Sequence, residues 1–427
     1  MIQRLKFLIV VSLMLILAGC KATESAKNTS QVRILHASPE TESLLLKVSG
    51  GDTKVSSVAT GTTSAYVALD AASTVYEIRS VTDNTLLATR TTGLNGGSRY
   101  TLIISGRRGA LVTAFVEEDT INPASANFRF RVQNFANVGA VDTYLVAQTS
   151  DVPASTVTLA GAGSNSGTAF LEQAAGSFQV VLTTAGTKDI VYESAKQTFT
   201  GNTSYTFAVV PGKSAKLANL TLLTFGDTGS ATVLPNLRSR VRAVHASPDA
   251  PLLAFNNNAA NMFSNVPYKA NSSYTTSTSG DRAMSLAAIV NGSLATVVSK
   301  TINLTGGEDY TLVAADRYSA IDLVRLADDN LPPITGKARV RFVNMSQDAG
   351  AVDVLVNFAK TFSSIGFKGA STYAELDAGT YTLGFNASNT SAGIASTAAT
   401  LLETGKIYTV MLLGPVASVD TKIITDN

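Results

Sequence analysis

The sequence predicts an all-β protein built from four tandem immunoglobulin-like β-sandwich domains. Three observations lead to this prediction. One short motif returns four times along the chain. Between the copies lie short runs rich in Val, Ile, Leu, Tyr and Thr, separated by Gly, Ser, Asn and Asp, as is typical of strands and turns. No stretch keeps the 3.6-residue apolar period of a helix over a helical length.

The repeated motif opens each unit. VRILHASPE at 32–40 returns as VRAVHASPD at 241–249, and weaker copies begin FRVQN at 130–134 and VRFVN at 340–344. The anchor positions His36, Asn134, His245 and Asn344 are 98, 111 and 99 residues apart. We therefore expect four units with the bounds 32–123, 124–235, 236–333 and 334–427.

The units also alternate in type. Units 1 and 3 carry His36 and His245, 209 residues apart, whereas units 2 and 4 carry Asn134 and Asn344, 210 residues apart. A pair of units that was duplicated as a whole is the simplest origin of this pattern. The alternation predicts that the working unit is a pair of sandwiches.

Within unit 1 we expect strands at 32–37, 44–48, 65–69, 74–80, 85–91, 100–105 and 111–116. Seven short strands in about 100 residues are typical of a two-sheet immunoglobulin-like sandwich. The order of the strands within the sheets does not follow from the pattern.

Two aromatic markers recur. A Tyr-Thr pair precedes the last apolar runs of each unit, at Tyr100, Tyr205, Tyr310 and Tyr408. Sandwiches often hold a corner with a tyrosine whose hydroxyl bonds to the backbone, so we expect a structural role for all four. The mid-unit aromatic residues are Tyr66, Phe170, Tyr274 and Tyr373. The regular place of these tyrosines favours core packing over a sugar-stacking surface.

Together the motifs resemble a known family. The VRxxHASPD opening, the FKGASTY segment at 367–373, the AGTY turn at 378–381 and the GxxYT close are similar to the bacterial domain-of-unknown-function family 4397. The likeness is strong over units 1, 3 and 4 and weaker over unit 2. It implies an extracytoplasmic, immunoglobulin-like module, found in tandem on lipoproteins and surface proteins, and it implies no established activity.

His36 and His245 are the only histidines, and a serine and an acid follow each of them in the motif. An envelope hydrolase with a site at a unit junction, using His36 or His245, is one interpretation. However, neighbours two apart in a strand do not easily aim at each other, and units 2 and 4 have Asn, which cannot replace a base. We prefer a neutral hydrogen-bonding role that ties the strand end to a loop.

The sequence predicts no metal site and no cofactor. Two histidines so far apart and a single cysteine do not form a tetrahedral zinc site. No calcium-binding loop pattern is present. We expect the carboxylates of Asp142, Asp328, Asp329 and Asp353 to be solvated loop groups.

Residues 1–19 predict a lipoprotein signal peptide. Arg4 and Lys6 precede a twelve-residue segment at 7–18 that is apolar except for Ser12, and it is shorter than the roughly 20 residues that a spanning helix needs. LAGC at 17–20 resembles the lipobox, in which the cysteine is lipidated and the chain is cut before it. We expect lipid on Cys20, the only cysteine, and a tether over 20–31. Lys21 favours the outer membrane by the sorting rule of enteric lipoproteins.

The net charge of the mature chain limits the class of partner that it can bind. Removal of Arg4 and Lys6 lowers Lys+Arg from 33 to 31, equal to the 31 Asp+Glu, so the mature chain is formally neutral. This argues against nucleic acid as a partner. We therefore expect a non-catalytic cell-envelope lipoprotein that is attached to the membrane through Cys20. Its array of sandwiches would present loops to an envelope protein or polysaccharide, in adhesion or scaffolding. The oligomeric state is not indicated.

Overall fold

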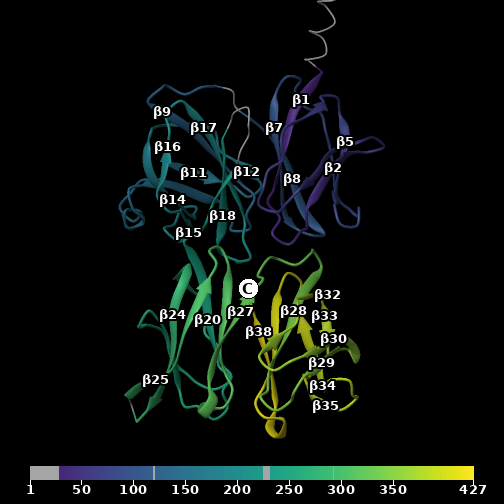
Figure 1. Cartoon of the computed structure of the whole chain (residues 1–427), viewed down its shortest axis with the longest axis vertical. Coiled ribbons are helices and arrows are strands. Elements are labelled where there is room, and N and C mark those ends of the chain that lie inside the picture. Colours follow the sequence, from purple (N-terminus) through teal and green to yellow (C-terminus); the bar gives the residue numbers. More distant parts are fainter. Residues whose placement is uncertain (1–27, 119–120, 225–230, 292) are drawn as a thin grey trace, which may run out of the picture.

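The computed structural model describes residues 28–118, 121–224, 231–291 and 293–427 (Figure 1). Within these ranges the chain forms four two-sheet β-sandwiches and no α-helix. Figure 1 shows two tiers: units 1 and 2 lie side by side in the upper tier, and units 3 and 4 in the lower tier. The predicted signal peptide, Cys20 and most of the predicted tether lie outside the described residues. No helix in the described part is long and apolar enough to cross a membrane.

The strands are as follows. Unit 1 contains β1 (Thr29–His36), β2 (Leu44–Val48), β3 (Thr53–Val58), β4 (Val67–Asp70), β5 (Thr74–Ser80), β6 (Leu86–Thr92), β7 (Arg99–Arg107) and β8 (Ala110–Glu117). Unit 2 contains β9 (Asn127–Asn134), β10 (Val141–Val146), the 3-10 helix η1 (Thr149–Asp151), β11 (Leu159–Ala162), β12 (Ser166–Gly167), β13 (Leu171–Ala174), β14 (Gly176–Thr184), β15 (Ile190–Glu193), β16 (Gln197–Phe199), β17 (Thr203–Pro211), β18 (Ala218–Thr224) and β19 (Ala231–Leu234). Unit 3 contains β20 (Arg238–His245), β21 (Leu253–Asn257), β22 (Ala260–Val266), β23 (Thr275–Thr278), β24 (Gly280–Val290), β25 (Ser293–Leu304), β26 (Asp309–Ala315), the 3-10 helix η2 (Tyr318–Ala320) and β27 (Asp322–Asp328). Unit 4 contains β28 (Lys337–Met345), β29 (Val352–Val356), β30 (Ala359–Ile365), β31 (Gly369–Ala370), β32 (Ala374–Asp377), β33 (Gly379–Tyr381), β34 (Leu383–Ala387), β35 (Gly393–Ser396), β36 (Thr400–Leu402), β37 (Ile407–Leu413), the 3-10 helix η3 (Val416–Ser418) and β38 (Asp420–Thr425).

All four units share one strand order. In unit 1 the sheets are β4-β1-β7-β8 and β3-β2-β5-β6, and the other units fill the same places. The opening strand pairs in parallel with the strand of the Tyr-Thr marker: β1 with β7, β9 with β17, β20 with β26 and β28 with β37. An immunoglobulin sandwich instead keeps its first, second, fifth and fourth strands in one sheet. The prediction of four all-β sandwich units is confirmed, and the strand order, which the sequence left open, differs from that of an immunoglobulin sheet.

The strand missing from the prediction in unit 1 is β3. Its sequence is TKVSSV, and only Val55 and Val58 are buried. β3 lies at the edge of its sheet, where most of its side chains face solvent, so it lacks the alternating apolar pattern of a strand.

The opening strands are covered on both faces. Val32 and Ile34 of β1 face the core of unit 1, while Leu35 points the other way and packs with Ile103 of β7 against Val210 of unit 2. Strands buried on both faces have nearly continuous apolar sequences, which explains the apolar runs that follow each Tyr-Thr marker.

Two apolar layers of this kind join neighbouring units, one in each tier. The upper layer contains Leu35, Ala37, Ile103 and Val116 from unit 1 and Phe135, Ala208, Val210 and Leu223 from unit 2. The lower layer contains Val244, Ala246, Val313, Ala315 and Leu326 from unit 3 and Val343, Met345, Met411, Leu413 and Ile424 from unit 4. The pairs that the alternating motifs predict therefore correspond to pairs that bury surface against each other.

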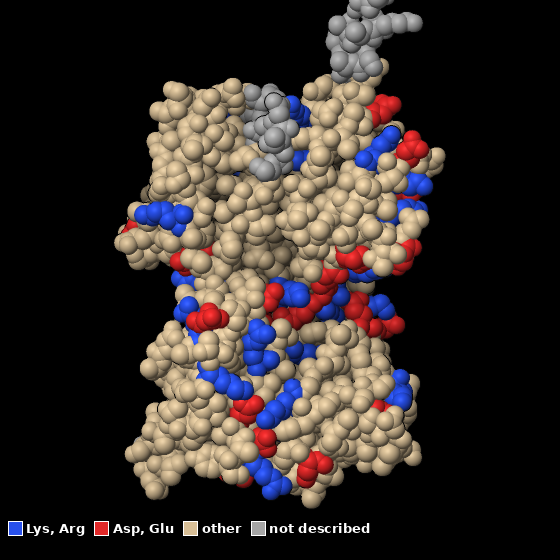
Figure 2. Space-filling view, in the orientation of Figure 1, with Lys and Arg blue, Asp and Glu red and all other residues tan. Residues whose placement is uncertain are grey.

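The tiers meet end to end. Unit 2 lies on unit 3, where Gly212 allows close backbone approach: a Cβ there would stand 2.2 Å from the carbonyl oxygen of Gly307. Unit 1 lies on unit 4, where Arg107 pairs with Glu375, and Arg107 also donates to the carbonyl of Pro332, at the end of unit 3, at 3.3 Å. In Figure 2 a group of charged side chains lies between the tiers, and others are spread over both tiers.

Candidate functional site

One arginine in each unit lies at the interface between the two sandwiches of its tier; Arg33, Arg242 and Arg341 are buried and Arg131 is half-buried. It is the arginine of each opening motif, and its Nε donates to the hydroxyl of the Tyr-Thr marker's threonine. The pairs are Arg33 with Thr101 at 2.9 Å, Arg131 with Thr206 at 3.0 Å, Arg242 with Thr311 at 2.8 Å and Arg341 with Thr409 at 2.9 Å. The side chain points away from its own core, because the neighbouring core residues of the strand point the other way.

Each of these guanidinium groups lies over the mid-unit aromatic ring. The distances to the ring centroids are 5.2 Å for Arg33 and Tyr66, 4.6 Å for Arg131 and Phe170, 4.8 Å for Arg242 and Tyr274 and 5.0 Å for Arg341 and Tyr373. A second arginine contacts the same ring: Arg99, Arg129, Arg240 and Arg339, respectively. The core position expected for the mid-unit tyrosines is wrong, because a ring beside two cations is stabilised there by cation–π attraction.

In the lower tier the arginines and acids are exchanged between units. Arg242 of unit 3 binds Asp426 of unit 4 at 2.6 Å, and Arg341 of unit 4 binds Asp328 of unit 3. All four side chains are at most 2% exposed. Burial by itself raises the pKa of Asp328, but Arg341 and Arg242 outweigh it and hold this pKa below its ordinary value.

In the upper tier the motif arginines donate to backbone carbonyl groups of the neighbouring unit. Arg33 pairs with Glu118 of its own unit at 3.0 Å and donates to the carbonyl of Thr224 in unit 2 at 3.3 Å. In return Arg131 of unit 2 donates to the carbonyl of Glu117 at 2.5 Å. The sequence has Phe225 at the place where the other units have the acid.

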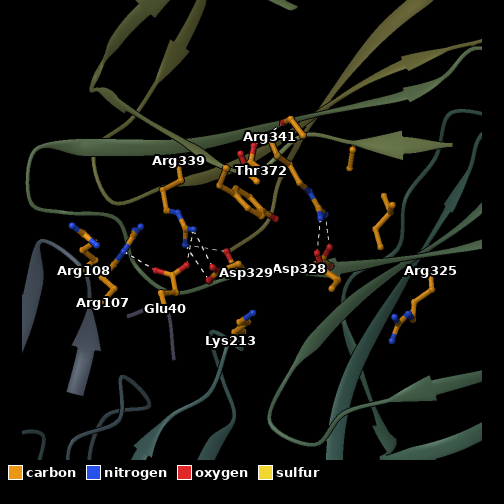
Figure 3. A pocket seen from close by; sticks show the side chains of 15 residues that line it. Glu40, Arg107, Arg108, Lys213, Arg325, Asp328, Asp329, Arg339, Arg341 and Thr372 are labelled. Carbon is orange, nitrogen blue, oxygen red and sulfur yellow. Dashed lines mark hydrogen bonds and ion pairs between the residues drawn. The ribbon is translucent and has the colours of Figure 1, made fainter. Parts of the chain in front are cut away.

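A cavity of about 560 Å³ lies where the four units meet (Figure 3). We call it the junction cavity; its lining includes Glu40 and Arg107 of unit 1, Lys213 of unit 2, Asp329 of unit 3 and Arg339 of unit 4. Arg339 binds both Glu40 and Asp329 at 3.0 Å, and Arg107 lies 3.1 Å from Glu40. These contacts bring together residues 299 positions apart in the chain.

The two carboxyls of this cluster differ in their proton affinity. Burial and the neighbouring Asp329 raise the pKa of Glu40 to about 7. The pKa of Asp329 is lowered to about 2, since its hydrogen bonds with Glu40 and Arg339 outweigh burial. One proton shared by a close carboxyl pair produces this separation.

The histidines and the asparagines of the opening motif make equivalent contacts. Nδ1 of His36 accepts the N–H of Ser38 at 3.3 Å, and Nε2 donates to the carbonyl of Glu42 at 3.0 Å; His245 does the same with Ser247 and Pro251. The amides of Asn134 and Asn344 also accept the N–H two residues on and donate to loop carbonyls. Burial lowers the pKa of both histidines, which keeps the rings neutral.

The four marker tyrosines each accept a backbone N–H from five residues upstream. The pairs are Asn95 with Tyr100 at 3.0 Å, Thr200 with Tyr205 at 3.3 Å, Thr305 with Tyr310 at 2.9 Å and Glu403 with Tyr408 at 3.0 Å. All four rings are buried. This geometry ties the turn before each strand to the core, as in the tyrosine corner of other sandwiches.

The comparisons with known proteins bear on the family. The model of a domain of unknown function (DUF4397) matches residues 30–144, 239–355 and 347–427. The chain belongs to this family. The first two DUF4397 matches begin near the opening motifs of units 1 and 3 and run on into the next unit.

Other comparisons add little. No curated protein matches the chain. Among solved structures, the Bacillus anthracis TIE protein is 10% identical over 90% of this chain and 68% of that chain, with a TM-score of 0.16. Similarity at this level supports no inference about fold or function.

In this DUF4397 chain the acids expected at the surface are more buried than the sequence predicts. Asp142 and Asp353 are only 6% and 2% exposed, and Asp328 is buried in the arginine network, so the expectation of solvated loop groups is wrong. Asp142 and Asp353 accept backbone N–H groups of the adjacent strands, from Gly161 of β11 at 2.8 Å and from Ser364 of β30 at 2.9 Å. Within the described ranges, no three His, Cys, Asp or Glu side chains group together as a metal site would require.

The arginine of the DUF4397 motif is the residue that sequence reasoning missed. It stands in all four copies of the motif, and a charged residue in the middle of an apolar strand is rare unless it is paired. That signal marks a buried partner but does not say that the partner lies in another unit.

Proposed function

We propose that this chain is a non-catalytic, lipid-anchored protein of the bacterial cell envelope that presents a fixed array of four sandwiches to a protein or polysaccharide partner. The observation that supports this most is the burial of inter-unit contacts, above all the exchanged pairs Arg242 with Asp426 and Arg341 with Asp328. Sandwiches with buried faces between them hold their end loops in constant relative positions, which suits a composite binding surface.

The end of the lower tier that faces away from the upper tier is the proposed contact surface. The chain enters the array at Thr29, at the end of unit 1 remote from the lower tier (Figure 1). A lipid on Cys20 would therefore leave the loops after β20 and β37 and the β24–β25 turn at the opposite end. Apolar residues here are 42–60% exposed: Leu252, Val290, Leu294 and Val416. Exposed apolar groups are a common feature of protein-binding sites.

A pull-down from envelope fractions tests this surface. The bait is the lipid-free chain of residues 21–427, and the variant carries Leu252→Asp with Leu294→Asp. We expect the variant to lose the proteins or polysaccharides that the unchanged bait retains. Leu86→Asp is the matched control, because Leu86 is 46% exposed on unit 1, away from this end. Equal capture by both variants would remove the proposed surface.

The hydrolase interpretation is tested with the histidines. Both ring nitrogens of His36 and His245 bind backbone groups, and the hydroxyl of Ser38 bonds to Thr41 and to the carbonyl of Gly106. The double variant His36→Asn, His245→Asn should keep both fold and partner binding. A hydrolytic activity that disappeared while the fold survived would overturn the non-catalytic proposal.

The anchor has a separate test. Cys20→Ser should abolish the incorporation of labelled fatty acid into the protein, with an unchanged melting temperature. A Cys20→Ser protein that still incorporated the label, or that misfolded, would contradict a lipid anchor at this residue.

A further inference from the structure

The junction cavity is lined by more cations than carboxylates. Arg107, Arg108, Lys213, Arg325, Arg339 and Arg341 line it, against Glu40, Asp328 and Asp329. Every unit contributes at least one of these cations. The volume of about 560 Å³ lies within the range of small-molecule pockets, roughly 300–1,000 Å³.

Most of these cations already have carboxylate partners. Arg341 pairs with Asp328, Arg339 with Asp329 and Glu40, Arg107 with Glu40 and Glu375, and Arg108 with Glu42 and Asp83 at its exposed side.

Lys213 and Arg325 are the exceptions. Among the described residues, the side chain of Lys213 has no ion pair or hydrogen bond, and Arg325 donates only to the carbonyl of Asn303. Lys213 is half-buried and its side chain lies at the cavity (Figure 3). Nε of Arg339, a side chain only 4% exposed, also lacks a hydrogen-bond partner in the part of the chain that the structure describes. A partly desolvated ammonium without a partner is unfavourable, so an anion at this place would be stabilised.

A second cavity supplies an internal comparison. It lies between units 2, 3 and 4, has a volume of about 470 Å³, and its lining includes Asn137, Lys216, Arg240 and Asp426. Val138 takes the motif position that Glu40 has in unit 1, and Arg240 pairs with Asp309. Lys216 is exposed. A half-buried lysine without a partner beside a titratable carboxyl is therefore a feature of the junction cavity and not of the second cavity.

We infer that the junction cavity binds a small molecule carrying a carboxylate or phosphate group, held between Lys213 of unit 2 and Arg339 of unit 4. The anion accepts hydrogen bonds from Nζ of Lys213 and from Arg339, and it bridges the two tiers. This site goes beyond the proposed surface at the far end of the lower tier and does not depend on it.

Glu40 gives the site a pH dependence. It faces Arg107 of β7, Arg339 of β28 and Asp329, which follows β27. When Glu40 is ionised it competes with the ligand for Arg339, and when it is protonated it does not. Because the pKa of Glu40 is raised to about 7, anion binding strengthens as the pH falls through neutrality.

Calorimetric titration of the lipid-free chain of residues 21–427 tests the site. The probes are sulfate, a tetrahedral dianion that stands in for a phosphate group, and D-glucuronate for the carboxylate group, because neither changes charge between about pH 6 and 8. Sodium chloride at matched ionic strength is the blank. Binding of sulfate alone assigns the site to phosphate-type ligands, and binding of glucuronate alone assigns it to carboxylates. Binding of neither probe overturns the inference.

Three variants decide whether the binding belongs to this cavity. Lys213→Met should weaken binding by about tenfold or more, because a charged hydrogen-bond donor is lost. Lys216→Met, the control from the second cavity, should bind as the unchanged protein does. Glu40→Gln should bind the anion equally at about pH 6 and about pH 8. Equal losses in Lys213→Met and Lys216→Met, or an unchanged pH dependence in Glu40→Gln, would contradict the site.

Discussion

In the lower tier each motif arginine binds an acid of the neighbouring sandwich, whereas in the upper tier Arg33 and Arg131 donate to backbone carbonyls across the interface. Arg242 and Arg341 exchange Asp426 and Asp328, while Arg33 keeps Glu118 within its own unit. Both tiers nevertheless have an apolar layer of the same kind between their sandwiches.

The difference separates two contributions to docking. The apolar layer is common to both tiers, so burial of apolar surface is sufficient to hold two sandwiches together. Buried ion pairs add little net stability because desolvation offsets their attraction, but each partner becomes costly when it is left alone. In the lower tier the exchanged pairs therefore determine which surfaces match, more than how tightly they bind.

The largest expected effect comes from leaving one of the exchanged arginines without its acid. Asp328→Ala leaves Arg341 buried without its carboxylate and should lower the free energy of unfolding by about 3–5 kcal/mol. Denaturant unfolding of the lipid-free chain measures this loss. Asp377→Ala is the control, because its carboxylate pairs with Lys337 at the surface and is 83% exposed. Similar losses in the two variants would mean that the exchange is unimportant.

Replacing the whole pair sharpens the same comparison. Arg341→Met with Asp328→Leu removes both charges at once, and we expect a cost at least about 2 kcal/mol smaller than that of Asp328→Ala alone. If the double variant were less stable than the single one, the ion pair itself would supply the docking energy of the lower tier.

The apolar layers should respond alike in both tiers. Phe135→Ala in the upper layer and Met411→Ala in the lower layer should each cost about 2–5 kcal/mol, since both side chains are buried between two units. Thermal unfolding of each variant measures the cost. A loss in one tier only would show that the two layers are not equivalent.

The pH dependence of stability is expected to be smaller. Glu40 binds its proton in the folded protein up to about pH 7 but loses it near 4.5 when unfolded, so its contribution falls as the pH rises through this window. Glu40→Gln should therefore gain on the order of 1 kcal/mol at pH above about 7, after discounting for partial exposure, and nothing at low pH. Denaturant unfolding below about pH 4.5 and above about pH 7 measures this difference.

Glu42 supplies the control with the opposite sign. Its pKa is lowered by hydrogen bonds from Ser80 and Arg108, so its contribution is present at neutral pH and is lost in acid. Glu42→Gln should lose stability at neutral pH relative to low pH. If both variants changed in the same direction, the raised pKa of Glu40 would be wrong.

The smallest effect concerns the motif histidines. His36→Asn should cost less than about 1 kcal/mol, because Asn134 and Asn344 make the same contacts at this position. His36→Ala leaves the N–H of Ser38 and the carbonyl of Glu42 unpaired and should cost about 1–3 kcal/mol. Thermal melts of both variants give the comparison; equal costs would mean that the polar contacts do not matter.

Much of the fold could be predicted from the repeats. The spacing of His36, Asn134, His245 and Asn344 gives the number of units, and the apolar runs give most strands of unit 1. The strand order could not be predicted, because a strand records which of its faces are buried and not which strand lies beside it. β3 could not be predicted because it is an edge strand, and an edge strand needs few apolar residues.

The site was harder to predict than the fold. Arg339 and Glu40 meet only because the tiers stack, and no local pattern links positions so far apart. The four motif arginines are visible in the sequence, yet their partners follow from the packing of one sandwich on another. The marker tyrosines were easier to interpret, because their partners lie five residues upstream.

Scanning calorimetry of the lipid-free chain tests the central claim most directly, namely that a pair of sandwiches and not a single sandwich is the cooperative unit. If buried layers join units 1 with 2 and 3 with 4, the calorimetric enthalpy divided by the van't Hoff enthalpy should lie between about 1 and 2. A value of about 4, with four separable transitions, would mean that the sandwiches unfold independently and would contradict the pair as the cooperative unit.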